Sequence, residues 1–217
     1  MEVYEYGNSS ASTIWIQPVD ARDLPEIERE ILEIQKRTEK EFRLIAVKVD
    51  SWNDDLSPWS APAVFGTAEF GGKAPAMLEK ILTLCNDKSK TYYICGYSLA
   101  GLFALWTACQ TNVFAGVAAA SPSVWFPGFL DCMKEDGMKS QTVYLSLGDR
   151  EEKTKNPVMA AVGDCIRESY DWLQKQGISS TLEWNPGNHF REPEVRVAKG
   201  VAWVINQTSH SSVYPQQ

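Results

Sequence analysis

A Gly-x-Ser-x-Gly element centred on Ser98 is the clearest chemical signal in this sequence. It lies between an apolar stretch at 92–95 and a helix-like stretch at 102–106, so it would form a sharp turn from a strand into a helix. Such a turn brings two backbone segments close together, which requires glycine on both flanks and exposes the serine above the sheet. The pattern therefore predicts that Ser98 is a nucleophile.

A serine hydroxyl needs a general base before it can attack at neutral pH, and the usual base is a histidine. The chain contains two histidines, His189 and His210. His210 lies in a polar tail, whereas His189 lies in a turn-rich loop after the last expected strand. An isolated loop histidine is more often an ordinary surface residue, but its pairing with Ser98 favours His189 as the base.

The histidine in turn needs a carboxylate to orient its ring. The loop after an expected strand at 142–147 offers Asp149, Glu151 and Glu152. These acids could also do no more than solvate the loop. Spacing alone does not choose among the three.

Acyl transfer also needs backbone N–H groups that stabilise the oxyanion of the tetrahedral intermediate. Leu99, directly after the serine, is the first expected donor. The second should come from the loop after an expected strand at 42–49, where Ser51 and Trp52 lie closest to the strand end.

Large aromatic side chains occur near the same positions. Trp59 belongs to the loop after 42–49, Trp125 follows the expected strand at 113–120, and Tyr97 precedes the candidate nucleophile. We assign these three residues to a pocket wall that would hold an apolar or aromatic part of a substrate. The alternative for the loop tryptophans is that they cap the protein core.

Strand-like and helix-like patterns alternate along the chain. Strands are expected at 13–17, 42–49, 91–95, 113–120, 142–147 and 180–184, and helices at 23–40, 75–86, 102–106, 156–176 and from 193 onward. This alternation predicts an α/β fold with a mostly parallel sheet and helices on both faces, whose catalytic loops gather at the carboxyl ends of the strands. We interpret residues 1–217 as a single domain with frayed ends at 1–10 and 209–217. We expect a minimal lid or none, because no long insertion follows 113–120.

Composition narrows the classes of partner. The 217 residues are 44% hydrophobic and carry a formal net charge of −7, which disfavours nucleic acid as a partner because phosphate binding relies on clustered Lys and Arg. No uninterrupted apolar stretch reaches the ~18 residues of a membrane span, and the first residues lack the pattern of a signal peptide. We therefore expect a cytoplasmic protein with no membrane partner. The sequence does not indicate an oligomeric state.

Four stretches together, 96–104, 120–125, 147–151 and 187–190, resemble the branch of the α/β-hydrolase superfamily that includes esterase D and the enterochelin esterases. The resemblance implies an α/β-hydrolase fold. In that family the triad acid commonly follows the strand-end glycine by three residues, which implies Glu151 for this chain. It also implies ester hydrolysis through an acyl-enzyme, with no metal and no organic cofactor.

These observations predict a serine hydrolase that acts on small-molecule carboxylic esters, with Ser98, His189 and Glu151 as its triad. One alternative is an acyltransferase, in which an alcohol other than water intercepts the same acyl-enzyme. A second alternative is a noncatalytic α/β domain that binds a ligand or partner.

Overall fold

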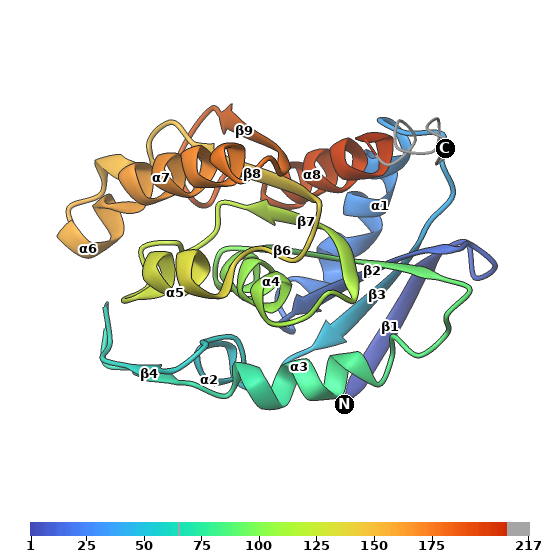
Figure 1. Cartoon of the computed structure of the whole chain (residues 1–217), viewed down its shortest axis with the longest axis horizontal. Helices are drawn as coiled ribbons and strands as arrows, with labels where there is room; N and C mark the ends of the chain where they lie inside the picture. Colours follow the sequence, from blue (N-terminus) through green and yellow to red (C-terminus); the bar gives the residue numbers. More distant parts are fainter. Residues whose placement is uncertain (65, 208–217) are drawn as a thin grey trace.

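A seven-stranded sheet forms the centre of the protein (Figure 1). The computed structural model describes residues 1–64 and 66–207, so the expected frayed end at 209–217 and His210 lie outside the described residues. The strand order is β1-β3-β2-β6-β7-β8-β9, in which β1 runs antiparallel to β3 and the other neighbours are parallel. The strands are β1 (Glu2–Gly7), β2 (Thr13–Val19), β3 (Arg43–Lys48), β6 (Thr91–Tyr97), β7 (Phe114–Ala120), β8 (Thr142–Gly148) and β9 (Ser179–Asn185).

Helices connect these strands, and a two-stranded sheet forms part of the connection between β3 and β6. The helices are η1 (Leu24–Glu26), α1 (Ile27–Gln35), α2 (Trp52–Asp55), α3 (Ala74–Leu82), α4 (Leu99–Gln110), α5 (Phe129–Asp136), η2 (Glu151–Lys153), α6 (Pro157–Ala160), α7 (Val162–Lys175) and α8 (Pro193–Gln207). The small sheet pairs β4 (Ser60–Ala61) with β5 (Phe70–Gly71). None of the helices in the described residues is long and apolar enough to cross a membrane.

The two faces of the sheet each carry an apolar core. On one face, α1 packs beside α8 and buries Ile27, Ile31 and Ile34, which the helical repeat places on one side. On the other face, α4 packs over β6 and β7, with α3, α5 and α7 around it. The strands between the two layers are buried on both sides, which explains their continuous apolar runs. The predicted α/β class with helices on both faces is confirmed.

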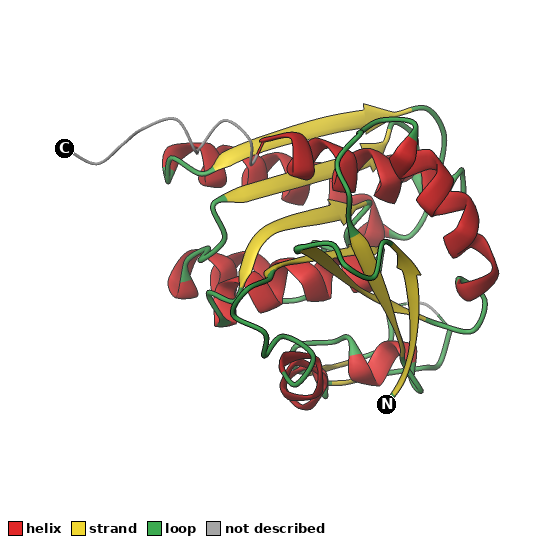
Figure 2. Cartoon of the chain, turned by 90° about the vertical axis from the view of Figure 1, so that its right-hand side faces the viewer, coloured by secondary structure: helices red, strands yellow, loops and turns green. Residues whose placement is uncertain are grey.

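The parallel strands bring distant segments of the chain to one edge of the sheet (Figure 2). Ser98 follows β6, Ser121 follows β7, and the loops after β8 and β9 begin at the same edge because the strands share one direction. Among the described residues, no inserted lid domain covers this edge.

The prediction of a frayed end at 1–10 is wrong for most of that segment. Residues 2–7 form β1, an edge strand that pairs with β3 along its whole length. Its side chains are exposed or half-buried, so the segment lacks the apolar run that marks the inner strands. Backbone pairing, the packing of Tyr4 and Tyr6 and an ion pair between Glu2 and Lys48 hold the strand in place.

Two of the predicted helices are interrupted. The helix expected at 23–40 begins with the 3₁₀ turn η1 and ends at Gln35, and the helix expected at 156–176 divides at Ala161 into α6 and α7. Asn156 caps α6 by accepting hydrogen bonds from the N–H groups of Val158 and Met159. The short elements α2, β4, β5 and α5, of two to eight residues each, were not expected from the sequence.

Candidate active site

The turn at Ser98 has the strained geometry that its sequence predicts. Ser98 has φ 57° and ψ −121°, a region that residues with side chains rarely adopt. A Cβ atom on Gly96 would lie 2.5 Å from the Ala100 carbonyl carbon, and one on Gly101 would lie 3.1 Å from the Gly96 carbonyl oxygen. Glycine is therefore required at Gly96, and at Gly101 the turn allows a Cβ only with a local shift.

His189 lies between Ser98 and Glu151. Its Nε2 atom is 2.9 Å from Ser98 Oγ, and its Nδ1 atom is 2.6 Å from Glu151 Oε2. An Nδ1–H that donates to the carboxylate leaves Nε2 free to accept a proton from the serine. About a quarter of the His189 side chain is exposed, so the nucleophile and its neighbour are open to a small substrate.

Glu151 is the buried carboxylate of this group, with 8% of its surface exposed. Its Oε1 atom accepts hydrogen bonds from Ser121 Oγ at 2.7 Å and from the Gly148 N–H at 2.7 Å. Burial alone would raise the pKa of Glu151, but the hydrogen bonds from His189, Ser121 and Gly148 lower it below its usual value. Glu151 is therefore held as a carboxylate that can orient and stabilise a charged imidazole.

The two other acids of this loop have different partners. Asp149 Oδ1 accepts a hydrogen bond from the Gly187 N–H at 2.8 Å, which ties the β8 loop to the loop that carries His189. Glu152 forms an ion pair with Arg167 at 2.9 Å. The geometry thus separates three acids that sequence spacing leaves equivalent.

Arg196 is a central residue of the site that the sequence reasoning missed. It lies on α8 with 2% of its surface exposed. Its guanidinium group donates to Glu151 Oε1 at 2.8 Å, Ser121 Oγ at 3.0 Å, Tyr97 Oη at 3.2 Å, Asn188 O at 2.9 Å and Pro186 O at 3.3 Å. One buried side chain therefore joins the acid to the loop that carries the histidine. A charged residue beside the apolar stripe of α8 is a weak signal for this role, because its contacts lie far along the chain.

Tyr97 also anchors the histidine loop. Its hydroxyl donates to the His189 carbonyl oxygen at 2.6 Å, and its ring centroid lies 5.2 Å from that of His189. Burial raises the pKa of Tyr97 to about 12, which keeps the hydroxyl protonated as a donor. Tyr97 therefore lies next to Ser98 in the chain and also fixes the backbone of His189.

Comparison with known proteins rests on structure, because no family model matches the sequence and no curated protein matches it either. An IroE-like serine hydrolase from Shewanella oneidensis is similar to it over 93% of this chain and 74% of the other, with a TM-score of 0.75 and 13% identity. The siderophore hydrolase EstA from Aspergillus nidulans matches over 95% and 90% of the two chains, with a TM-score of 0.69 and 17% identity. Est1E from Butyrivibrio proteoclasticus matches over 95% and 94%, with a TM-score of 0.61 and 14% identity.

The chain has the α/β-hydrolase fold. In this α/β-hydrolase sheet, the strand beside β6 is β2, whereas β3 lies one strand further away. The Val49 N–H donates to the Val19 carbonyl oxygen at 2.9 Å, so the ends of β2 and β3 remain together and α2 begins next to them.

The candidate oxyanion donors differ in their hydrogen bonding. The Leu99 N–H is at the first position of α4 and the Trp52 N–H at the first position of α2, where neither has an acceptor within its own helix. The Ser51 N–H donates to Asp55 Oδ2 at 3.0 Å, so it is already used. Of the two residues that the sequence left open, Trp52 retains an available donor.

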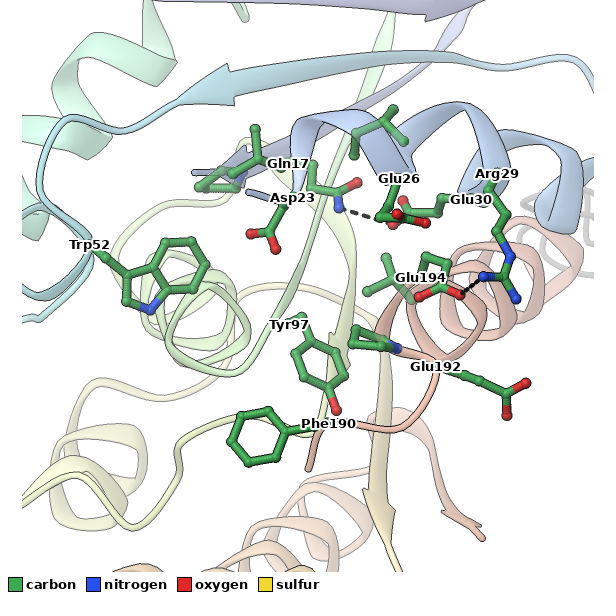
Figure 3. A pocket seen from close by; sticks show the side chains of 15 residues that line it. Gln17, Asp23, Glu26, Arg29, Glu30, Trp52, Tyr97, Phe190, Glu192 and Glu194 are labelled. Atoms are coloured by element: carbon green, nitrogen blue, oxygen red, sulfur yellow. Dashed lines mark hydrogen bonds and ion pairs between the residues drawn. The ribbon is translucent and has the colours of Figure 1, made fainter. Parts of the chain in front are cut away.

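The predicted pocket residues separate into two groups. Tyr97 lines a hollow of about 370 Å³ that Figure 3 shows in close view, together with Trp52, which was predicted as an oxyanion donor and not as a pocket residue. Trp59 instead packs against Phe126 and donates its indole N–H to the Pro127 carbonyl oxygen at 3.0 Å, and Trp125 packs against Phe70. For these two loop tryptophans, the contacts favour the alternative that they cap the core.

Metal binding was not expected at this site. Among residues 1–64 and 66–207, no group of three or more His, Cys, Asp or Glu side chains is arranged to hold a metal ion. The buried charges around His189 are instead paired with each other, as the ion pair between Arg196 and Glu151 illustrates.

Proposed function

We propose that this protein is a carboxylic ester hydrolase that works through an acyl-enzyme on Ser98. The observation that carries the proposal is the continuous hydrogen-bond chain from Ser98 through His189 to Glu151, with links of 2.9 and 2.6 Å, at a strained turn from a strand into a helix. A nucleophile, a base and an orienting acid at these distances are the arrangement that activates a serine.

In the acylation step, Ser98 Oγ attacks the ester carbonyl carbon while His189 Nε2 takes its proton. Glu151 stabilises the imidazolium that forms, and its low pKa keeps it ionised throughout. The N–H groups of Leu99 and Trp52 bind the oxyanion of the tetrahedral intermediate. His189 then gives its proton to the leaving alcohol oxygen as the bond from carbon to that oxygen breaks.

In the deacylation step, a water molecule takes the place of the alcohol. His189 removes its proton as the water oxygen attacks the acyl carbon, and the proton then passes to Ser98 Oγ when the acyl-enzyme bond breaks. The products are a carboxylic acid and the regenerated serine. His189 Nε2, which is hydrogen-bonded to Ser98 Oγ at 2.9 Å, takes and returns every proton in this scheme, so no further acid or base is needed.

The structural comparisons support the reaction class. The similar proteins include a serine hydrolase, a siderophore hydrolase and a ferulic acid esterase, all of which share the fold at 11–17% identity. Their different substrates do not identify the acyl group or the alcohol for this chain. The proposal is therefore limited to hydrolysis of small carboxylic esters.

A fluorophosphonate probe tests the proposal without knowledge of the substrate. We expect the intact mass of the folded protein to increase by one probe adduct, and peptide mapping to place the adduct on Ser98. Ser98→Ala should abolish the adduct, and His189→Ala should slow its formation by several orders of magnitude. Heat-denatured protein serves as the control for non-specific labelling.

Peptide mapping also separates Ser98 from Ser123, whose Oγ lies 3.5 Å from Ser98 Oγ. Labelling of Ser123, or labelling of Ser98 that is unchanged in His189→Ala, would contradict the assigned roles. Turnover of p-nitrophenyl acetate then measures hydrolysis itself, and the loss of turnover in Ser98→Ala links it to the same residue.

A further inference from the structure

The hollow of about 370 Å³ beside the candidate site is large enough for an organic group (Figure 3). Ligand pockets begin at ~300 Å³. Its walls come from the end of β2, from η1 and α1, and from the segment that joins His189 to α8. Tyr97, next to Ser98, and Phe190, next to His189, both line it. A substrate whose ester lies at Ser98 could therefore extend into this hollow.

Most of the charge around the hollow is negative. The lining carboxylates are Asp23, Glu26, Glu30, Glu192 and Glu194. Arg29 also lines the hollow, but it pairs with Glu194 at 3.0 Å and more than half of its side chain is exposed, while Glu192 pairs with Arg191 at 3.5 Å. Once these two pairs and the buried Glu30 are set aside, Asp23 and Glu26 are the lining carboxylates that no ion pair between described residues neutralises, so the hollow favours a positive group.

Glu30 is a buried carboxyl group on the wall of the hollow. It is 3% exposed, and its Oε2 atom accepts a hydrogen bond from Gln17 Nε2 at 3.1 Å. Its Oε1 atom is buried without a partner among the described residues. A buried polar atom without a partner is costly. Figure 3 shows the Glu30 side chain beside Gln17 on the wall of the hollow, so a positive group bound there would interact with it through charge and without a hydrogen bond.

The electrostatic environment of Glu30 is consistent with a cationic partner. Burial raises the pKa of Glu30 to about 8, with smaller contributions from Asp23 and Glu194, while the hydrogen bond from Gln17 opposes this change. A positive group in the hollow would offset the cost of ionising Glu30. The same group would interact with Asp23 and Glu194, whose charges act on Glu30.

Aromatic rings at the hollow indicate the kind of cation. Trp52, Tyr97 and Phe190 all line it, and Phe190 is 84% exposed, which is unusual for a large apolar side chain. Aromatic faces bind organic ammonium groups through cation–π attraction, and carboxylates add a Coulombic contribution. We propose that the hollow binds an organic ammonium group, so that this protein prefers esters with a cationic alcohol or acyl part. The substrate preference rests on the proposed esterase function.

Measurements of ligand binding test the proposed cation site independently of catalysis. Choline and 3,3-dimethyl-1-butanol have nearly the same shape, but only choline carries a positive charge. We expect isothermal titration calorimetry on the wild-type protein to show that choline binds about tenfold more tightly than the neutral alcohol. Equal affinity for the two compounds, or no choline binding, would overturn the proposal.

Substitutions then locate the binding. Glu30→Gln on α1 and Glu194→Gln on α8 each remove one carboxyl group from the wall of the hollow. Each should weaken choline binding about fivefold or more, while the affinity for 3,3-dimethyl-1-butanol stays the same. Glu33→Gln is the matched control, because it makes the same change on α1 at a residue that pairs with Lys36 and Arg37 away from the hollow. Thermal unfolding of each variant verifies folding. Choline binding that survives both substitutions, or falls equally in Glu33→Gln, would contradict the assignment.

Turnover separates this proposal from the esterase function. We expect kcat/KM for butyrylcholine to exceed that for 3,3-dimethylbutyl butyrate about tenfold, after correction for their rates with hydroxide. If the protein hydrolyses p-nitrophenyl acetate but shows no preference for choline or its ester, the cation site is wrong and the esterase stands. If choline binds through Glu30 and Glu194 but neither probe labelling nor hydrolysis occurs, the esterase is wrong and the cation site stands.

Discussion

Glu151 and Glu30 are both buried glutamates near the same edge of the sheet, yet their pKa values move in opposite directions. Glu151 accepts hydrogen bonds from three groups that lower its pKa, those of His189, Ser121 and Gly148. Glu30 has a single donor, Gln17, and burial raises its pKa to about 8. Glu151 also has positive groups beside it, His189 and Arg196, whereas Glu30 has the carboxylates Asp23 and Glu194 nearby. The two residues therefore differ in donors and in neighbouring charge, although both are buried.

This difference matches the roles that we propose. A triad acid must stay ionised while the histidine gains and loses a proton, and the donors around Glu151 provide that stability. Glu30 has a single side-chain donor, so a positive group bound in the hollow would shift its carboxyl group toward the ionised form.

Of the substitutions considered, removal of the charge of Glu151 should lower activity most. Glu151→Gln should lower kcat for p-nitrophenyl acetate about 10³- to 10⁴-fold, because the imidazolium loses its counter-charge and the histidine can adopt the wrong tautomer. Steady-state kinetics and the rate of probe labelling measure the effect. Glu152→Gln, in the same loop but paired with Arg167, should stay within about twofold of wild type. A similar loss in both variants would mean that the loop and not Glu151 is responsible.

Trp52 lies where the catalytic region meets the hollow, so two substitutions at this position separate its backbone from its side chain. Proline is compatible with the first position of a helix and removes the N–H, whereas alanine keeps it. We expect Trp52→Pro to have a kcat about 10²-fold lower than that of Trp52→Ala, because it lacks one oxyanion donor. Equal kcat values for the two variants would assign the second donor to another loop, with the end of β2 as the next candidate.

Arg196 forms an ion pair with Glu151, whereas Glu30 has no ion pair with any described residue. Arg196→Met should lower kcat about 10²-fold through misplacement of His189, with KM nearly unchanged. The pKa of Glu151 should rise in this variant, so that the acidic limb of the pH profile moves to higher pH. Arg196→Lys should recover part of kcat, since it keeps the charge but not the planar fork. If both variants lose thermal stability but keep the wild-type pH profile, Arg196 has a structural role only and does not position His189.

The smallest expected effect is a change in how the free energy of unfolding depends on pH. Because the folded-state pKa of Glu30 lies above its unfolded value of 4.5, the folded protein binds the extra proton between pH 4.5 and about 8. The free energy of unfolding should therefore fall as pH rises through this window, by up to about 1.4 kcal/mol per pH unit. Denaturant unfolding of Glu30→Gln should show a flatter dependence between pH 5 and pH 8 than wild type.

Glu33→Gln provides the control for this measurement. The pKa of Glu33 is lowered to about 2 by Lys36 and Arg37, so its titration in the folded state lies below the window. Wild type and Glu33→Gln should therefore share the same slope between pH 5 and pH 8. Parallel curves for wild type and Glu30→Gln would show that Glu30 is already ionised in the folded protein.

Much of the sheet could be predicted from the sequence because each inner strand is a local signal. The run at 113–120 is apolar throughout and that at 142–147 is mostly apolar, and the structure places β7 and β8 within a residue of those limits. The edge strand β1 carries no such run, since solvent covers much of its surface and backbone pairing holds it. Local pattern predicts burial well and predicts pairing partners poorly.

The sequence by itself determined the turn around Ser98, the assignment of His189 as its partner and the alternating order of strands and helices. These depend on residue type and on neighbours in the chain, such as the close approach at Gly96. Spacing left three acids open and the family resemblance implied Glu151, which the structure places beside His189. The tertiary structure alone decided that Arg196 joins them and that β2 lies between β3 and β6. It also formed the hollow at Glu30 from segments far apart in sequence. These features depend on distances between remote residues, which are set by strand order and helix packing and leave no local pattern in the chain.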